Sequence, residues 1–155
     1  MKFLIPLLGK TKESYLENGI RDYSSRLGRF ATVEMPVLKE RHSLKQPDEV
    51  VKLNDSVLLL EHGGVAGLKV ALDPTGQSAS SEELAALLTA WENQSVGTVC
   101  FFIGGHLGLH RSVLQQADMV LSLSRLTFTH EMTRLILVEQ LYRACTIKAG
   151  HRYHK

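Results

Sequence analysis

Short, nearly uninterrupted apolar runs alternate with amphipathic segments along the chain. We interpret the runs as buried strands of a parallel sheet, because a strand that is covered on both faces has few polar positions. The expected strands span residues 3–8, 31–37, 67–72, 98–103 and 119–123. The segments between them repeat apolar residues at helical spacing, which predicts helices over residues 13–27, 47–60, 80–92, 111–116 and 129–148.

Local signals support the starts of two of these helices. Ser14 and Glu17 have the three-residue spacing of a capping box, and Ser80 and Glu83 repeat it further along the chain. Strands that alternate with helices predict an α/β fold in which helices flank a mostly parallel sheet. With 155 residues, no internal repeat and no long linker, the chain is expected to form a single domain over residues 1–155.

Three loops are expected at the carboxyl ends of strands, which is where such sheets bind their ligands. They span residues 73–77, 104–110 and 122–130, and each is rich in glycine, serine or threonine. Gly104 and Gly105 allow the backbone to approach a ligand closely. Each loop taken alone is better explained as a simple turn, and the three together suggest one shared binding site without specifying its ligand.

The spacing of polar residues excludes several familiar sites. The glycines lack the spacing of a dinucleotide fingerprint, and no Lys-Ser/Thr pair completes a phosphate-binding P-loop. His130 and Glu131 open a helix, but Arg134 stands where a zinc protease has its second histidine. No Gly-x-Ser-x-Gly elbow of a serine hydrolase occurs. What remains is a pocket of backbone groups that suits an uncharged ring such as adenine, with no metal expected.

Charge and cysteine content narrow the class of protein further. The formal net charge is only +2, so any contact with nucleic acid must depend on a local basic patch. Basic residues do outnumber acidic ones from Arg134 onward, although Glu139 and Arg143 also have the spacing of a helical ion pair. The two cysteines and the short apolar N-terminus predict a cytoplasmic protein with neither a disulfide framework nor a membrane segment.

Four segments carry a resemblance to a known family. They read LDPTG at residues 72–76, FIGGHLGL at 102–109, LSLSRLTFTH at 121–130 and RLILVEQLYRA at 134–144, and Tyr153-His154-Lys155 follows. In order and spacing they resemble the YbeA-type SPOUT methyltransferases, which act on N3 of a pseudouridine in 23S ribosomal RNA. The chain departs from the pattern of that family at His106-Leu107, and at Thr129, where relatives often carry proline.

The resemblance implies a fold and a cofactor. The fold would be the SPOUT, or alpha/beta-knot, fold with a trefoil knot near the C-terminus, and the methyl donor would be S-adenosyl-L-methionine. The residues implied to contact this cofactor are Leu72, Gly104, Leu123, Ser124, Arg125, Leu126, Thr127 and Phe128. Leu72 and Leu126 would pack the adenine, Gly104 would let the chain pass close to the cofactor, and backbone groups of residues 123–128 would form hydrogen bonds.

The resemblance also implies how RNA is bound and which group takes up its proton. Residues Arg143, Arg152, Tyr153 and His154 are expected to contact ribosomal RNA of the large subunit, in the assembled ribosome. His154 is the first candidate for the base that removes the N3 proton, because histidine titrates near neutral pH. His130 is the second, although the preferred interpretation of His130 is a residue at the start of a helix that packs against the knot. The position of His154 is equally typical of a solvated chain end.

Two further expectations concern assembly and alternatives. The last helix is apolar on more than one face, and the surplus face needs a partner, which the resemblance makes a second subunit of a homodimer. The alternative functions are a SPOUT methyltransferase for another RNA position, and a non-catalytic RNA-binding module of ribosome assembly.

Overall fold

The computed structural model describes residues 1–39, 46–151 and 153 and has the α/β architecture expected from the sequence. Five parallel strands form the main sheet in the order β3-β1-β6-β5-β7. The strands are β1 (Lys2–Leu4), β3 (Thr32–Glu34), β5 (Leu68–Ser78), β6 (Thr98–Phe102) and β7 (Met119–Ser122). β6, which is apolar and buried from Val99 to Phe102, takes the central position, where a strand is covered on both faces.

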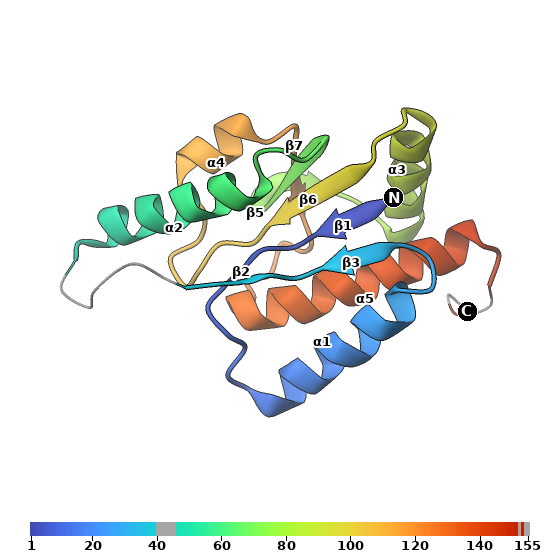
Figure 1. Cartoon of the computed structure of the whole chain (residues 1–155), viewed down its shortest axis with the longest axis horizontal. Helices are drawn as coiled ribbons and strands as arrows, with labels where there is room; N and C mark the ends of the chain where they lie inside the picture. The colour runs from blue at the N-terminus through green and yellow to red at the C-terminus, as the bar shows by residue number, and fades with distance from the viewer. Residues whose placement is uncertain (40–45, 152, 154–155) are drawn as a thin grey trace.

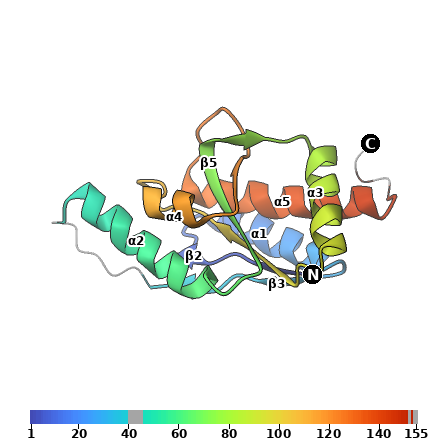
Figure 2. The same cartoon turned by 90° about the horizontal axis from the view of Figure 1, so that it is seen from above.

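Helices cover both faces of the sheet (Figure 1 and Figure 2). One face carries α1 (Ser14–Leu27), α3 (Ser81–Asn93) and α5 (His130–Lys148), and the other carries α2 (Asp48–Gly63) and α4 (Arg111–Gln116). Alternate side chains of β6 supply the two cores, with Val99 and Phe101 on the α1-α3-α5 side and Cys100 and Phe102 on the α2-α4 side. None of the helices in the described part of the chain is long and apolar enough to cross a membrane.

The first two expected strands are each split in two, which corrects the sequence interpretation. Residues 3–8 divide at Pro6 and residues 31–37 divide at Pro36, because proline has no backbone N–H to donate to a sheet. Beyond the prolines the chains pair again, as β2 (Leu7–Leu8) beside β4 (Val37–Leu38) in a separate parallel pair. This short pair carries the chain from β1 to the loop before α1.

One of the two expected capping boxes is present. Ser80 accepts a hydrogen bond from the Glu83 backbone N–H at 3.2 Å, and Glu83 accepts one from the Ser80 N–H at 2.7 Å. The box expected from Ser14 and Glu17 is wrong, because Glu13 is the N-cap of α1 and makes no side-chain capping bond. The Glu131 carboxylate of α5 instead accepts the backbone N–H groups of Lys12 and Glu13, immediately before the helix.

Two elements run further than expected. α2 continues to Gly63 rather than ending near residue 60. β5 pairs with β7 up to Leu72, bulges out, and pairs again from Gln77 to Ser78. The expected turn after Leu72 is therefore an excursion within one strand, and it projects residues 73–76 at the carboxyl edge of the sheet.

Candidate functional site

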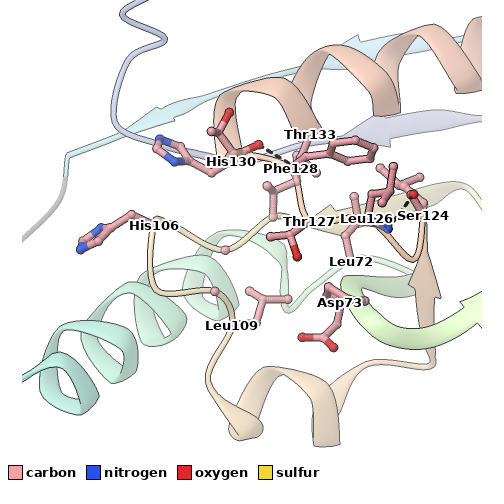
Figure 3. Close-up of a pocket in the computed structure, with 17 residues that line it drawn as sticks. Leu72, Asp73, His106, Leu109, Ser124, Leu126, Thr127, Phe128, His130 and Thr133 are labelled. Carbon is pink, nitrogen blue, oxygen red and sulfur yellow. Dashed lines mark hydrogen bonds between the residues drawn. The ribbon is translucent and has the colours of Figure 1, made fainter.

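The three loops expected at the carboxyl edge of the sheet line one cavity of about 430 Å³. Figure 3 shows Leu72 and Asp73 from β5, Leu109 from the second loop and Thr127 from the third around a common space. The remaining lining residues are Pro74, Ile103, Gly104, Gly105, His106, Gly108, Leu123, Ser124, Leu126, Phe128, Thr129, His130 and Thr133. Concave, largely apolar pockets of this size are typical of small-molecule and cofactor sites.

The first wall of the cavity is the bulge in β5. Leu121 of β7 is the register partner of both Leu72 and Gln77, so the four residues between them loop out of the ladder. Gly76 closes the bulge against β7, where an added Cβ would lie 2.6 Å from the Val120 oxygen. Asp73 begins the bulge, and its Oδ1 accepts hydrogen bonds from the Thr75 backbone N–H at 2.9 Å and from Thr75 Oγ1 at 2.6 Å.

The second wall is the glycine loop after β6, which folds back on itself. Gly108 donates its N–H to the Gly105 oxygen at 3.0 Å and has a φ of +79°, a conformation that favours glycine. A Cβ on Gly104 would lie 2.7 Å from the Gly108 oxygen and the Leu109 nitrogen. The close approach at Gly104 is thus to its own loop, whereas the sequence interpretation assigned it to the cofactor.

α2 and α4 hold the far end of this glycine loop. The His110 backbone N–H donates to Ser56 Oγ of α2 at 3.1 Å, and Ser56 is buried. The His110 side chain caps α4 by accepting at Nδ1 from the Ser112 N–H at 3.2 Å. His110 is therefore occupied structurally and does not line the cavity.

The third wall is the segment between β7 and α5. Ser124 Oγ accepts the Leu126 backbone N–H at 2.9 Å, and Thr129 caps α5 by accepting the Met132 N–H at 3.2 Å. Thr129, where the chain departs from the family pattern, is therefore the N-cap residue of α5. Leu126 is 72% exposed, so an apolar side chain stands at the open mouth of the cavity.

Seven of the eight residues expected to contact a cofactor line the cavity. They are Leu72, Gly104, Leu123, Ser124, Leu126, Thr127 and Phe128. Arg125 is exposed and is not a lining residue. The sequence interpretation did not include Asp73, Leu109 or Thr133 among the expected cofactor contacts, although Asp73 belongs to the LDPTG segment that it singled out. An acidic residue directly after a buried strand at the ligand edge was the available signal.

His130 is the histidine best placed for chemistry in the described part of the chain. It lines the cavity at the first turn of α5, and its Nε2 lies 3.9 Å from Glu131 Oε1. His106 also lines the cavity, but its ring lies at the outer end of the glycine loop, away from Leu72 and Asp73 (Figure 3). Among the residues described, no group of three His, Cys, Asp or Glu side chains is arranged to hold a metal ion.

A buried charged cluster fixes the start of α5 beside the cavity. The Glu131 carboxylate accepts the backbone N–H groups of Lys12 and Glu13 at 3.1 and 3.3 Å. Arg134 is 2% exposed and donates to Thr11 Oγ1 at 3.0 Å and to the Leu8 carbonyl. Burial acts to raise the pKa of Glu131, but the two backbone hydrogen bonds outweigh it, and the pKa lies below its ordinary value.

The residues expected to bind RNA lie at the other end of α5, as far as they are described. Arg143 pairs with Glu139 at 2.6 Å, the alternative that the sequence had left open. The Tyr153 ring packs on Tyr142 with centroids 4.7 Å apart and lies under the Arg143 guanidinium, and its hydroxyl donates to Glu139 Oε1 at 3.2 Å. Burial, together with the hydrogen bond between the Tyr153 and Tyr23 hydroxyls and the nearby Glu139 charge, raises the pKa of Tyr153.

Two of the predicted residues, Arg152 and His154, lie outside the described residues. Their assignment to RNA binding and catalysis stays a prediction. Tyr153 itself is packed, with its ring against Tyr142 of α5 and its hydroxyl 3.2 Å from the Tyr23 hydroxyl of α1.

The expected apolar surplus on α5 is mostly covered within the chain. α1 and α3 both pack against α5, with Leu135 against Gly19 of α1, and Ser81 of α3 donates to Gln140 at 2.7 Å. No residue of α5 is exposed. The large exposed apolar side chains in the described residues instead include Tyr15 on α1 and Val50, Leu53 and Val57 on α2. A homodimer therefore does not follow from α5 alone.

Comparison with known proteins places the chain among methyltransferases. A family described as "Predicted SPOUT methyltransferase" matches residues 1–154. The chain is 46% identical over 155 residues, all of both chains, to "Ribosomal RNA large subunit methyltransferase H" of Desulfotalea psychrophila. It is 40% identical over 154 residues, 99% of both chains, to the protein of that name from Syntrophotalea carbinolica.

Solved structures show the same fold at low sequence identity. A probable methylase family protein from Haemophilus influenzae matches with a TM-score of 0.58 and 11% identity, covering 99% of this chain and 70% of that chain. A probable methyltransferase from Bordetella pertussis matches with a TM-score of 0.57 and 13% identity, covering 93% of this chain and 95% of the other. At these identities the likeness establishes the fold alone.

Proposed function

This chain belongs to the SPOUT methyltransferase family, and on that basis we propose that it methylates N3 of a pseudouridine in 23S ribosomal RNA. The observation that carries the proposal is the convergence of the three carboxyl-edge loops on one cavity, in a chain similar over its full length to large-subunit rRNA methyltransferases. SPOUT methyltransferases use S-adenosyl-L-methionine. The trefoil knot of the family is part of the proposal.

The cavity fits this cofactor by size and by chemistry. Leu72, Leu109 and Leu123 give it apolar walls for an adenine ring, while the backbone of residues 123–128 offers hydrogen-bonding groups at the same place. Leu126 at the mouth is placed to cover the ring from outside. When bound, S-adenosylmethionine supplies an electrophilic methyl group on its sulfonium. The protein contributes alignment of that methyl with the target nitrogen, and exclusion of water.

The target nitrogen must lose its proton, because the N3–H of pseudouridine is a weak acid. A base within hydrogen-bonding reach, or a cationic surrounding that favours the anion, meets this need. His154 is the proposed acceptor from the C-terminal tail. His130 is the second candidate, since it lines the cavity and its Nε2 lies 3.9 Å from Glu131 Oε1.

The geometry of α5 bears on how the tail reaches a cavity. Thr133 lines the cavity, whereas Tyr153 is held by Tyr142 and Arg143 one helix segment further on. Ten residues of helix span about 15 Å, so Tyr153 is anchored well away from the cavity of its own chain. If the tail takes part in the reaction, it acts at the cavity of another subunit. We therefore include a two-fold homodimer in the proposal, with the tail of one subunit at the cavity of the other.

The RNA contacts proposed for this arrangement are those of the tail, namely Arg143, Arg152, Tyr153 and His154. Arg143 and Tyr153 already share Glu139 within the chain, so they are ordered before RNA arrives. Phosphates compete with Glu139 for Arg143, and the Tyr153 ring is suited to stacking on an unpaired base. With a net charge of only +2, recognition of a shaped target such as the assembled ribosome is favoured over general RNA affinity.

The test is mass spectrometry of large-subunit ribosomal RNA from cells that lack this protein. We expect one methyl group to be missing from one pseudouridine and to return when purified protein, S-adenosylmethionine and assembled ribosomes are combined. Isolated 23S RNA serves as the comparison substrate and should be modified far more slowly. Loss of a methyl at another position would favour the alternative SPOUT enzyme, and an unchanged methylation pattern with slow ribosome assembly would favour the non-catalytic module.

A further inference from the structure

We infer that Asp73 binds the ribose hydroxyls of the methyl donor through its free carboxylate oxygen, an inference that rests on the proposed function. Among the described residues that line the cavity, Asp73 is the only carboxylate. Every other lining residue is apolar, a glycine, a hydroxyl-bearing residue or a histidine. A carboxylate oxygen that faces such a pocket is suited to a hydrogen-bond donor of the ligand, because a half-buried charge is most stable when both of its oxygens are hydrogen-bonded.

The chain positions this carboxylate by a local device. The ladder between β5 and β7 stops at Leu72 and resumes at Gln77, and the interruption begins with Asp73. Gly76 makes the return possible, since any side chain there would collide with the β7 backbone at Val120 and Leu121. A regular strand would have turned Asp73 into the ladder, whereas the bulge presents it to the cavity (Figure 3).

One oxygen of the carboxylate is fixed and the other is available. Oδ1 accepts the Thr75 backbone N–H at 2.9 Å and the Thr75 hydroxyl at 2.6 Å. Within the part of the chain that the structure describes, Oδ2 accepts no hydrogen bond. Thr75 therefore sets the orientation of the group and leaves Oδ2 as an acceptor for a ligand. A carboxylate oxygen accepts hydrogen bonds from hydroxyl groups strongly, since charge-assisted bonds are roughly twice as strong as neutral ones.

The position of Leu72, the residue before Asp73, indicates which part of the methyl donor Asp73 would contact. Leu72 directly precedes it and forms an apolar wall suited to the adenine. Because the ribose is bonded directly to the adenine, it would lie beside Asp73 when the adenine packs on Leu72. The ammonium group of the methionine portion would also attract a carboxylate, but it lies at the other end of the ligand, and the experiment separates the two.

The test is calorimetry with three ligands on the wild type and on Asp73→Asn. The ligands are S-adenosylhomocysteine, methylthioadenosine, which lacks the amino-acid portion, and the 3′-deoxy analogue of S-adenosylhomocysteine. We expect Asp73→Asn to weaken S-adenosylhomocysteine and methylthioadenosine equally, by about ten- to a hundredfold, and to change the deoxy analogue much less. Asp118→Asn is the matched control, because that carboxylate accepts the Lys69 N–H at 2.8 Å outside the cavity.

The outcomes separate this inference from the proposed function. If wild-type protein binds none of the ligands, the methyltransferase assignment fails. If it binds them and Asp73→Asn binds equally well, only the role of Asp73 is overturned. A loss confined to S-adenosylhomocysteine would assign the carboxylate to the ammonium group and contradict the ribose. Thr75→Val, which removes one bond to Oδ1 and keeps the charge, should cost less than Asp73→Asn; an equal cost would reduce Asp73 to a support of the bulge.

Discussion

At the scale of single residues, two glycines decide whether the cavity can form. Gly76 lies against the backbone of β7, and Gly104 lies against the backbone of Gly108 and Leu109. In both places the neighbour is main chain that has no room to move aside, so a methyl group must displace a whole segment. The glycine loop and the bulge are thus shaped by contacts within the protein before any ligand is considered.

Gly104→Ala is therefore expected to lower both stability and ligand binding. The added methyl would sit 2.7 Å from the Leu109 nitrogen, and we expect the free energy of unfolding to fall by about 1–3 kcal/mol as the loop is pushed apart. Urea denaturation and calorimetry with S-adenosylhomocysteine check the two effects. Gly97→Ala is the control, because nothing lies within 4 Å of its Cβ position. Weakened binding with unchanged stability would mean that Gly104 contacts the ligand only.

The sequence indicated which residues line the cavity more readily than it indicated their roles. The resemblance pointed to Leu72, Gly104 and residues 123–128, and all but Arg125 line the cavity. The role of Gly104 depends on how the loop closes on Gly108, which is a matter of three-dimensional path that no spacing rule encodes. Asp73 was passed over because its function depends on a strand bulge, and the turn-like LDPTG segment gave no sign that the strand resumes after it.

At the scale of elements, α1 begins with help from α5. The N-cap residue Glu13 makes no side-chain bond, and Glu131 accepts the N–H groups of Lys12 and Glu13 instead. This long-range contact ties the loop after β2 to the first turn of α5, next to His130 on the cavity wall. A local capping box at Ser14 would have fixed the start of α1 without this contact to α5.

Glu131→Gln is expected to destabilise the protein in a manner that depends on pH. Neutralising the carboxylate weakens the two charge-assisted bonds from the Lys12 and Glu13 backbone N–H groups, so the free energy of unfolding should fall by about 1.5–3 kcal/mol at pH 7. Because the folded pKa lies below the ordinary value of 4.5, this stabilisation is full above that value and is lost as pH falls through the folded pKa.

Denaturation curves of wild type and Glu131→Gln from pH 7 down to pH 3 measure this difference. The gap between them should be constant at the upper end and should close in acid. Glu17→Gln, an exposed change in the first turn of α1, is the control and should have little effect throughout. A gap that persists unchanged at pH 3 would show that the carboxylate charge does not hold α1.

Prediction of the elements succeeded where the signal was local. The α3 capping box, the apolar β6 run and the short α4 all depend on neighbouring residues and occur where expected. The divided strands failed because the apolar pattern continues across Pro6 and Pro36, while the ladder needs N–H groups that proline lacks. The start of α1 failed because its partner is 118 residues away, beyond any local rule.

At the scale of the whole molecule, one sheet separates two cores, and each contains one cysteine. Cys100 lies in the core under α2 and α4, and Cys145 lies in the core formed with α1 and α3. Both thiols are buried. Burial raises the pKa of Cys100 to about 12 and that of Cys145 to about 11, so neither forms the reactive thiolate readily in the folded protein. The two cysteines are natural reporters of whether the cores open together.

Thiol labelling across a urea series should find a single transition for both. In Cys145→Ala only Cys100 reports, and in Cys100→Ala only Cys145 reports; each alanine also creates a small cavity, so midpoints are compared with the fluorescence transition of the same variant. We expect labelling and fluorescence to coincide in both variants, because the strands of one sheet face both cores and cannot leave one intact while the other opens.

Protein concentration must be held constant, since a homodimer would shift every midpoint together. Labelling of Cys145 well before the fluorescence change would mean that α5 detaches from the sheet on its own, and the chain would then behave as two cooperative units rather than as the single domain expected from its sequence.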